Sequence, residues 1–356
     1  MQRQFLTKGM IAAILATGLF ACEKDDAVVV PPPSNGQTLT LNGGAGGASA
    51  ANSVYVDLST DKQDSVKRNS WDLAFYSGSS FRVGLNSTNG ASAVMVNKTD
   101  INSVTSSDIV LDDLAIALGT PGAFDNIDDI VTGNIGNTVI AEISATDASN
   151  KVYVINTEGG SHTATLSLDK LIKVRILRKG NGYTLQYAKL SETTFKTVDI
   201  LKDAAYNFKH FSFTSNALVN AEPEKAKWDI MWTWSIYYGG TGAGAYPYGY
   251  SDVVFTNAPG GAQAAEKIYA NSTVRNSAYD AYTTDSLATV SFTSSFDAIG
   301  SKWRATTGTI GVKTDRFYLV KDPAGNVYKL KFISFTTQDG GVRGKPVIEY
   351  KLVKKG

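Results

Sequence analysis

The chain has 356 residues, and its 34 Lys and Arg almost balance its 33 Asp and Glu, so that the formal net charge is +1. This near-neutrality excludes the strongly basic face that nucleic-acid binding requires. One cysteine and two histidines in the whole sequence also exclude an internal disulfide framework and a zinc cluster of Cys and His.

The first predicted element is a lipoprotein signal peptide over residues 1–21. Arg3 and Lys8 precede an apolar stretch, Met10 to Phe20, that is too short to span a bilayer stably. A small residue then precedes Cys22, which we predict to be the lipidation site and the first residue of the mature protein. Multiple acyl chains would anchor it durably, because each buried methylene contributes about 0.8 kcal/mol.

Residues 22–36 are predicted to form the acylated tether and a linker. The acidic cluster Glu23–Asp26 resembles the export signal that sends some Gram-negative lipoproteins to the outer face of the outer membrane. The prolines at 31–33 favour an extended spacer. We therefore predict an outer-membrane lipoprotein that faces the cell exterior, with its folded part beginning near Gln37.

The remaining sequence is typical of β structure, with 33 glycines, 17 tyrosines and 15 phenylalanines in short alternating runs. The clearest hairpin covers residues 316–332, where the connection Asp322–Asn326 contains a proline and a glycine suited to a tight turn. Alternation predicts that Lys329 and Lys331 face water. Helical periodicity is scarce, apart from a short helix expected around residues 112–118.

Similar segments in the two halves of the chain predict an internal duplication. Each half contains a strand-like run (residues 54–59 or 210–214), a Trp-Asp strand (71–75 or 228–232), a hairpin with alternating cations (151–176 or 316–332) and a final strand (183–190 or 347–352). We therefore predict an all-β protein with two tandem antiparallel β domains, residues 37–196 and 197–356.

An aromatic, glycine-rich segment in the second half is the first candidate for a binding site. Glycines let a loop bend while flat rings stay exposed, which suits stacking on a planar or sugar-like ligand. A loop whose rings pack on their own domain fits the composition equally well. The candidate ligand-binding residues are Met231, Trp232, Trp234, Tyr237, Tyr238, Tyr246, Tyr248 and Tyr250.

The second half resembles the HmuY family of haem-binding surface lipoproteins, and the first half does so more weakly. The resemblance rests on the aromatic strand His210–Phe213, the Trp228–Met231 segment, the glycine-rich stretch to Phe255 and the hairpin over 316–332. It implies an all-β domain with a ligand cleft between sheet and loops, and capture of haem for an uptake system. The best-known members clamp the iron with two histidines, but the corresponding region here, residues 259–315, has none. The resemblance therefore implies haem capture without a bis-histidine clamp.

Few residues of the usual haem-ligand types remain in the mature sequence. His162 lies in a glycine-rich connection, and we expect it to be an exposed loop residue with no ligand role. We expect His210 to be a polar residue at the edge of a strand. Met95 and Met231 read as core thioethers. If haem binds, His210 or Met231 is the candidate iron ligand, and an iron-free porphyrin is equally compatible.

The sequence favours a binding protein over an enzyme, because it contains no recognisable arrangement of nucleophile, base and orienting group. Ser161 and His162 are neighbours and would point to opposite faces of an extended chain. We expect a surface-anchored lipoprotein that captures haem or a related porphyrin and passes it to an outer-membrane receptor. The alternative is a non-catalytic glycan-binding or structural, adhesive surface lipoprotein.

Overall fold

The computed structural model describes residues 31–116, 124–129, 135–158 and 166–356. Residues 1–32 form one unit and residues 33–356 form a second, whose fold is described below. The predicted signal peptide, Cys22 and His162 lie outside the described residues. Within the described ranges, no helix is both long enough and apolar enough to cross a membrane.

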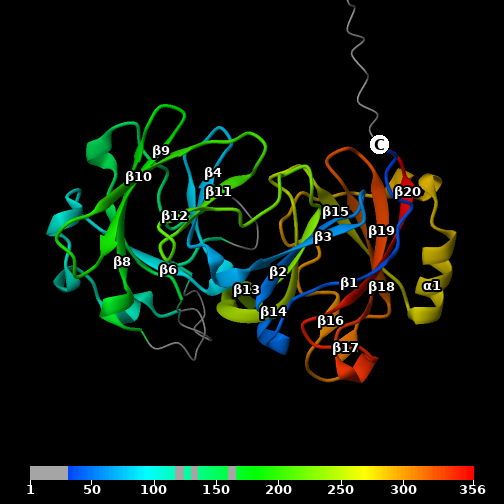
Figure 1. The fold of residues 1–356 in the computed structure, drawn as a ribbon. Helices are drawn as coiled ribbons and strands as arrows, with labels where there is room; N and C mark the ends of the chain where they lie inside the picture. The colour runs from blue at the N-terminus through cyan, green and yellow to red at the C-terminus, as the bar shows by residue number, and fades with distance from the viewer. Residues whose placement is uncertain (1–30, 117–123, 130–134, 159–165) are drawn as a thin grey trace, which may run out of the picture. The chain divides into compact units, whose positions relative to one another are not determined.

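Antiparallel sheets dominate the fold, which confirms the all-β prediction (Figure 1). One five-stranded sheet contains, in order, β10 (Lys196–Leu201), β9 (Gly182–Lys189), β8 (Ile172–Arg178), β7 (Val152–Asn156) and β6 (Ser92–Val96). The other contains β1 (Thr38–Thr40), β20 (Val347–Lys354), β19 (Val327–Ser334), β18 (Arg316–Lys321) and β15 (Gln263–Ile268).

Two four-stranded sheets and a short ribbon complete the described strands. The first four-stranded sheet contains β12 (Ala217–Val219), β11 (Phe208–Ser212), β4 (Leu73–Tyr76) and β5 (Val83–Leu85). The second contains β14 (Tyr246–Thr256), β13 (Ile230–Gly239), β2 (Asn52–Asp57) and β3 (Lys62–Lys67). The ribbon pairs β16 (Arg304–Ala305) with β17 (Gly311–Val312), and helix α1 covers Ser272–Ala281.

Each four-stranded sheet packs on one five-stranded sheet and forms a lobe with its own core. We call the lobe built from β4–β12 the first lobe, because its buried side chains, Phe75, Leu185 and Phe211 among them, form one hydrophobic cluster. The second lobe contains β1–β3 and β13–β20, and its central cluster includes Trp232 and Tyr328. Burial of this apolar surface is the main term that favours folding.

Each lobe combines strands from both predicted halves of the chain. The early strands β1 and β2 pair with β20 and β13, whereas the later strand β11 pairs with β4 (Figure 1). The boundary predicted at residue 196 coincides with the start of β10, which pairs with β9 of the first half. The first three strands of each predicted half are thus exchanged between the lobes, and the division into 37–196 and 197–356 stays a prediction.

The two Trp-Asp segments make matching contacts at this exchange. Oδ2 of Asp72 accepts a hydrogen bond from the main-chain N–H of Phe213 at 2.6 Å, and Oδ2 of Asp229 accepts one from Leu58 at 2.8 Å. Burial raises the pKa of Asp72 to about 6 and raises that of Asp229 well above its usual value. Each aspartate thus holds a strand from the other half, and the correspondence supports the predicted duplication.

Two buried asparagines, Asn86 and Asn257, repeat a second set of contacts. The Nδ2 group of each donates to two main-chain carbonyls, those of Arg68 and Trp71 for Asn86 and those of Lys225 and Trp228 for Asn257. The Oδ1 atom of each accepts two further hydrogen bonds. Because both residues are fully buried, these side chains satisfy main-chain groups that water does not reach.

We expect Asn257→Ala to lower the free energy of unfolding by about 3–5 kcal/mol, because it leaves several buried polar groups without partners. Urea unfolding followed by circular dichroism measures the change. Asn181→Ala, at an exposed position, is the matched control and should change the free energy by less than about 0.5 kcal/mol. A loss below about 1 kcal/mol at Asn257 would show that the network relaxes without cost.

The predicted hairpin over residues 316–332 is confirmed as β18 and β19, but the exposure expected for Lys329 is wrong. Lys329 is only 6 % exposed, and its Nζ donates to the main-chain carbonyls of Tyr279, Asp280 and Tyr282 at the C-terminal end of α1. A cation there is favoured by the helix dipole. Lys173, at the matching position of β8, is also buried and donates to Val104 O at 2.8 Å.

Two smaller predictions also differ from the structure. Met95, expected in the core, is 58 % exposed because it lies on β6, an edge strand of its sheet. The short helix expected around residues 112–118 is a 3₁₀ turn over Leu111–Leu114, and residues 117–118 lie outside the described ranges. The strands predicted in the regions 151–176, 183–190 and 347–352 are confirmed.

Candidate functional site

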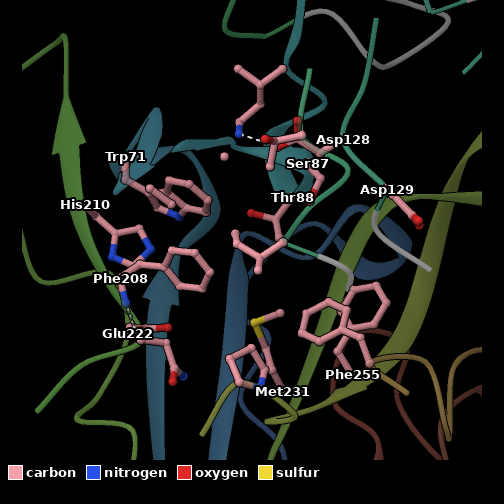
Figure 2. Close-up of a pocket in the computed structure, with 18 of the residues that line it drawn as sticks. Trp71, Ser87, Thr88, Asp128, Asp129, Phe208, His210, Glu222, Met231 and Phe255 are labelled. Carbon is pink, nitrogen blue, oxygen red and sulfur yellow. Dashed lines mark hydrogen bonds between the residues drawn. The ribbon is translucent and has the colours of Figure 1, made fainter. Parts of the chain in front are cut away.

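A largely apolar pocket lies between the two four-stranded sheets and is lined by both halves of the chain (Figure 2). Its cavity volume is about 150 Å³, which is below the roughly 300–1,000 Å³ of typical small-molecule and cofactor sites, so a larger planar ligand would have to extend through the open mouth or part the walls. The residues that line it include Tyr55, Trp71, Ala74, Gly84, Leu85, Thr88, Asp128, Asn207, Phe208, His210, Glu222, Trp228, Met231, Phe255 and Phe296. No lysine or arginine is among the described residues of this lining.

Two matching rows of side chains form the opposing walls. In the first lobe, His210 on β11 is opposite Ala74 on β4, which is opposite Gly84 on β5. In the second lobe, Tyr55 on β2 is opposite Met231 on β13, which is opposite Phe255 on β14. All six residues line the pocket.

The pocket exists because the two rows differ in size. The first lobe has Ala74 and Gly84 at the positions where the second lobe has Met231 and Phe255, so one wall is set back. A Cβ atom added at Gly84 would lie 3.2 Å from an oxygen of Asp128, which shows how closely the segment that contains Asp128 approaches this wall. The sequence contains part of this signal, since the offset that aligns Trp71 with Trp228 also places Ala74 against Met231.

His210 is buried in this wall, and its expected position at a strand edge is wrong. Strand β11 lies inside its sheet, between β12 and β4, and His210 is only 5 % exposed. Its imidazole contacts the edge of the Trp71 ring, with 4.6 Å between centroids, and lies beside Phe208 (Figure 2). Burial, and then the charge of Lys209, lower the pKa of His210 to about 3. The imidazole is therefore neutral at physiological pH and keeps a nitrogen lone pair that can bind a metal.

Met231 supplies the second ligand-type atom on the opposite wall. It is 6 % exposed, and Figure 2 shows its sulfur directed into the pocket. Its side chain belongs to a cluster with Trp228 and Phe255. Imidazole and thioether are both axial ligands that proteins use for haem iron. Among the described residues, no group of three or more His, Cys, Asp and Glu side chains is placed to hold a bare metal ion.

Two buried or half-buried carboxyl groups flank the pocket, and the sequence did not single out either one. Glu222 is 8 % exposed and accepts a hydrogen bond from the N–H of Phe208 at 2.9 Å, and burial raises its pKa to about 8. Asp128 accepts hydrogen bonds from Leu85 N and Val139 N at 2.6 and 2.8 Å, and burial raises its pKa to about 6. At neutral pH Glu222 is therefore mostly protonated and Asp128 mostly ionised.

The aromatic segment expected as an exposed loop forms the long hairpin β13–β14 instead. Of its eight candidate residues, only Met231 lines the pocket. Trp232 is 1 % exposed and lies in the central core of the second lobe, whereas Trp234 packs on the other face of the sheet. A register shift between Thr233 and Ser235 interrupts the alternation, so the rings do not form one surface.

The tyrosines of this hairpin mostly contact one another. Tyr237 is buried and donates to Asp297 at 2.9 Å, and Tyr238 stacks on Phe124. Tyr248 meets both Tyr246 and Tyr250 edge to face, and it is 42 % exposed.

A family model described as HmuY protein matches residues 49–350, which include every strand that lines the pocket. No curated protein and no solved structure matches the chain.

Proposed function

Because the chain belongs to the HmuY family, which is known for haem-binding surface proteins, we propose that it captures haem or a related porphyrin in the pocket between its two four-stranded sheets. The observation that carries the proposal is His210, a neutral imidazole held in an apolar, aromatic-lined pocket. An iron porphyrin supplies a metal that accepts a nitrogen or sulfur ligand.

The pocket residues fit a flat, apolar ligand. Trp71 and Phe208 lie beside His210, and Trp228 and Phe255 lie on the other wall. Aromatic side chains favour stacked or edge-on contacts with a planar ring system. In this proposal His210 holds the iron, Met231 is the second candidate ligand, and no bis-histidine clamp forms.

Lipid attachment at Cys22 and display on the outer membrane remain part of the proposal. The charged tether and the proline-rich linker would separate the folded lobes from the bilayer. Captured haem would then pass to an outer-membrane receptor for uptake, and no catalytic step is required.

The direct test is a titration with haemin followed by absorbance. We expect a saturable shift of the Soret band at a ratio of one haemin per chain. A linear, non-saturating change would contradict the proposal. If the alternative glycan-binding function is correct, the protein should bind sugars on a glycan array and should not bind haemin.

The double variant Tyr246→Ala, Tyr248→Ala locates the site. These rings do not line the pocket, so we expect the variant to bind haemin with an affinity within about twofold of the unchanged protein. The same titration measures it, with near-ultraviolet circular dichroism to verify the fold. Loss of the Soret shift in a folded double variant would place the ligand on the β13–β14 hairpin instead.

A further inference from the structure

The corner of the pocket that is lined by Tyr55 and Trp228 contains a hydrogen-bonding group that the protein itself leaves unused. Tyr55 and Trp228 meet edge to face, with 5.0 Å between ring centroids, and both are more than nine-tenths buried. The Trp228 Nε1–H has no hydrogen-bond partner among the described residues, and the Tyr55 side chain lines the pocket beside it. A buried donor without a partner costs about 1–3 kcal/mol, so this indole points to a ligand atom that accepts its hydrogen bond.

Glu222 adds a third group to the same corner. It lines the pocket together with Tyr55 and Trp228, and its charge contributes to the raised pKa of Tyr55. One of its oxygens accepts the N–H of Phe208. Because burial raises the pKa of Glu222 to about 8, the carboxyl group carries a proton at neutral pH and can donate it in a hydrogen bond.

We propose that Tyr55, Glu222 and Trp228 form a subsite for an uncharged oxygen acceptor, such as a carbonyl or an ester oxygen, on the buried edge of the ligand. The inference rests on the pocket of the proposed function. The described lining that these three residues share contains no lysine or arginine, so a carboxylate would enter without a countercharge. A ligand that carries carboxylates must therefore leave them at the mouth of the pocket.

Glu222 is the pocket group that we expect to change its charge between pH 7 and 9. On β2, burial raises the pKa of Tyr55 well above its usual value of 10.0, so its hydroxyl stays protonated. On β11, His210 stays neutral, and the Lys209 ammonium is the nearby charge that favours ionisation of Glu222. Asp128, across the pocket, has a pKa of about 6 and is already ionised in this range.

The test uses Nile red, a flat, uncharged dye with one carbonyl oxygen, and the full folded protein. Binding requires protonated Glu222, so the affinity should be constant near pH 7 and fall about tenfold by pH 9. Glu222→Gln keeps an amide donor and does not ionise, so its affinity should not change over this range. Tyr55→Phe should weaken binding at pH 7 by about threefold to tenfold, through loss of one hydrogen bond.

Matched controls are Glu224→Gln and Tyr269→Phe, which remove an acid and a hydroxyl outside the pocket lining and should behave like the unchanged protein. Affinity for Nile red that is independent of pH in the unchanged protein, or equal in the Tyr55→Phe variant, would overturn the subsite.

Titrations with haemin and with haemin dimethyl ester separate this inference from the proposed function. Haemin dimethyl ester, whose side-chain oxygens are uncharged, should bind at least as tightly as haemin. Binding of haemin but not of its ester would show that the corner takes a carboxylate, and would overturn the inference. If neither tetrapyrrole binds but Nile red shows the expected pH dependence, the porphyrin function fails and the subsite stands.

Discussion

Separate expression of residues 33–193 and 194–356 is expected to give two chains that do not fold alone. The division falls in the exposed turn between β9 and β10. It removes four strand pairings, which are β1–β20, β2–β13, β4–β11 and β9–β10. Since native domains are stable by only about 5–15 kcal/mol, neither half can lose these partners and the burial that accompanies them. Unpaired edges should instead cause aggregation.

Mixing the two halves during refolding should restore a one-to-one complex with a single cooperative thermal transition, measured by size-exclusion chromatography and circular dichroism. A protease site placed in the same turn and cleaved after folding is the control, because the cleaved protein keeps every pairing. Cooperative unfolding of either half alone would show that the predicted boundary separates independent domains and that the exchange between lobes is not essential.

His210→Phe is expected to weaken haemin binding by roughly tenfold to a hundredfold, about 1.4–2.8 kcal/mol. Phenylalanine fills the same buried space and can keep the edge contact with Trp71, but it removes the lone pair available to iron. The bound form should also lose the absorbance spectrum of a ligated haem. Because burial holds the pKa of His210 at about 3, the spectrum of the unchanged protein should persist from pH 7 to pH 5, where an ordinary histidine becomes protonated.

Iron-free protoporphyrin is the matched ligand for this variant, since its binding does not use the lone pair and should be unchanged. Met231→Leu tests the other candidate with a substitution that conserves volume. If His210→Phe keeps the haemin spectrum while Met231→Leu changes it, the thioether is the iron ligand. If both variants keep it, neither residue binds the iron.

Local features of this fold could be predicted, and long-range ones could not. The hairpin over residues 316–332 depends on its own alternation and on a turn in which Gly325 adopts φ of +91°. The burial of Lys329 depends on α1, which lies about fifty residues away in sequence. Likewise, the repeated segments indicated a duplication, but no local pattern shows which copy a strand will pair with.

The candidate site was harder to predict, because it depends on which residues face each other across two sheets. The aromatic composition indicated that these rings contact a ligand, but most of them fill the β13–β14 hairpin and its core. The open volume of the pocket depends on the small side chains of Ala74 and Gly84, and neither residue type by itself indicates a binding site. Histidine is a residue type that binds haem iron, but the burial of His210 follows from the position of β11 between β12 and β4.

Trp71 and Trp228, which occupy matching places in the two halves, both line the pocket. Each indole is a natural fluorophore, and a porphyrin absorbs light in the range where tryptophan emits. The protein therefore carries an optical reporter in each wall, and occupancy should appear as quenching of its own emission without any attached label.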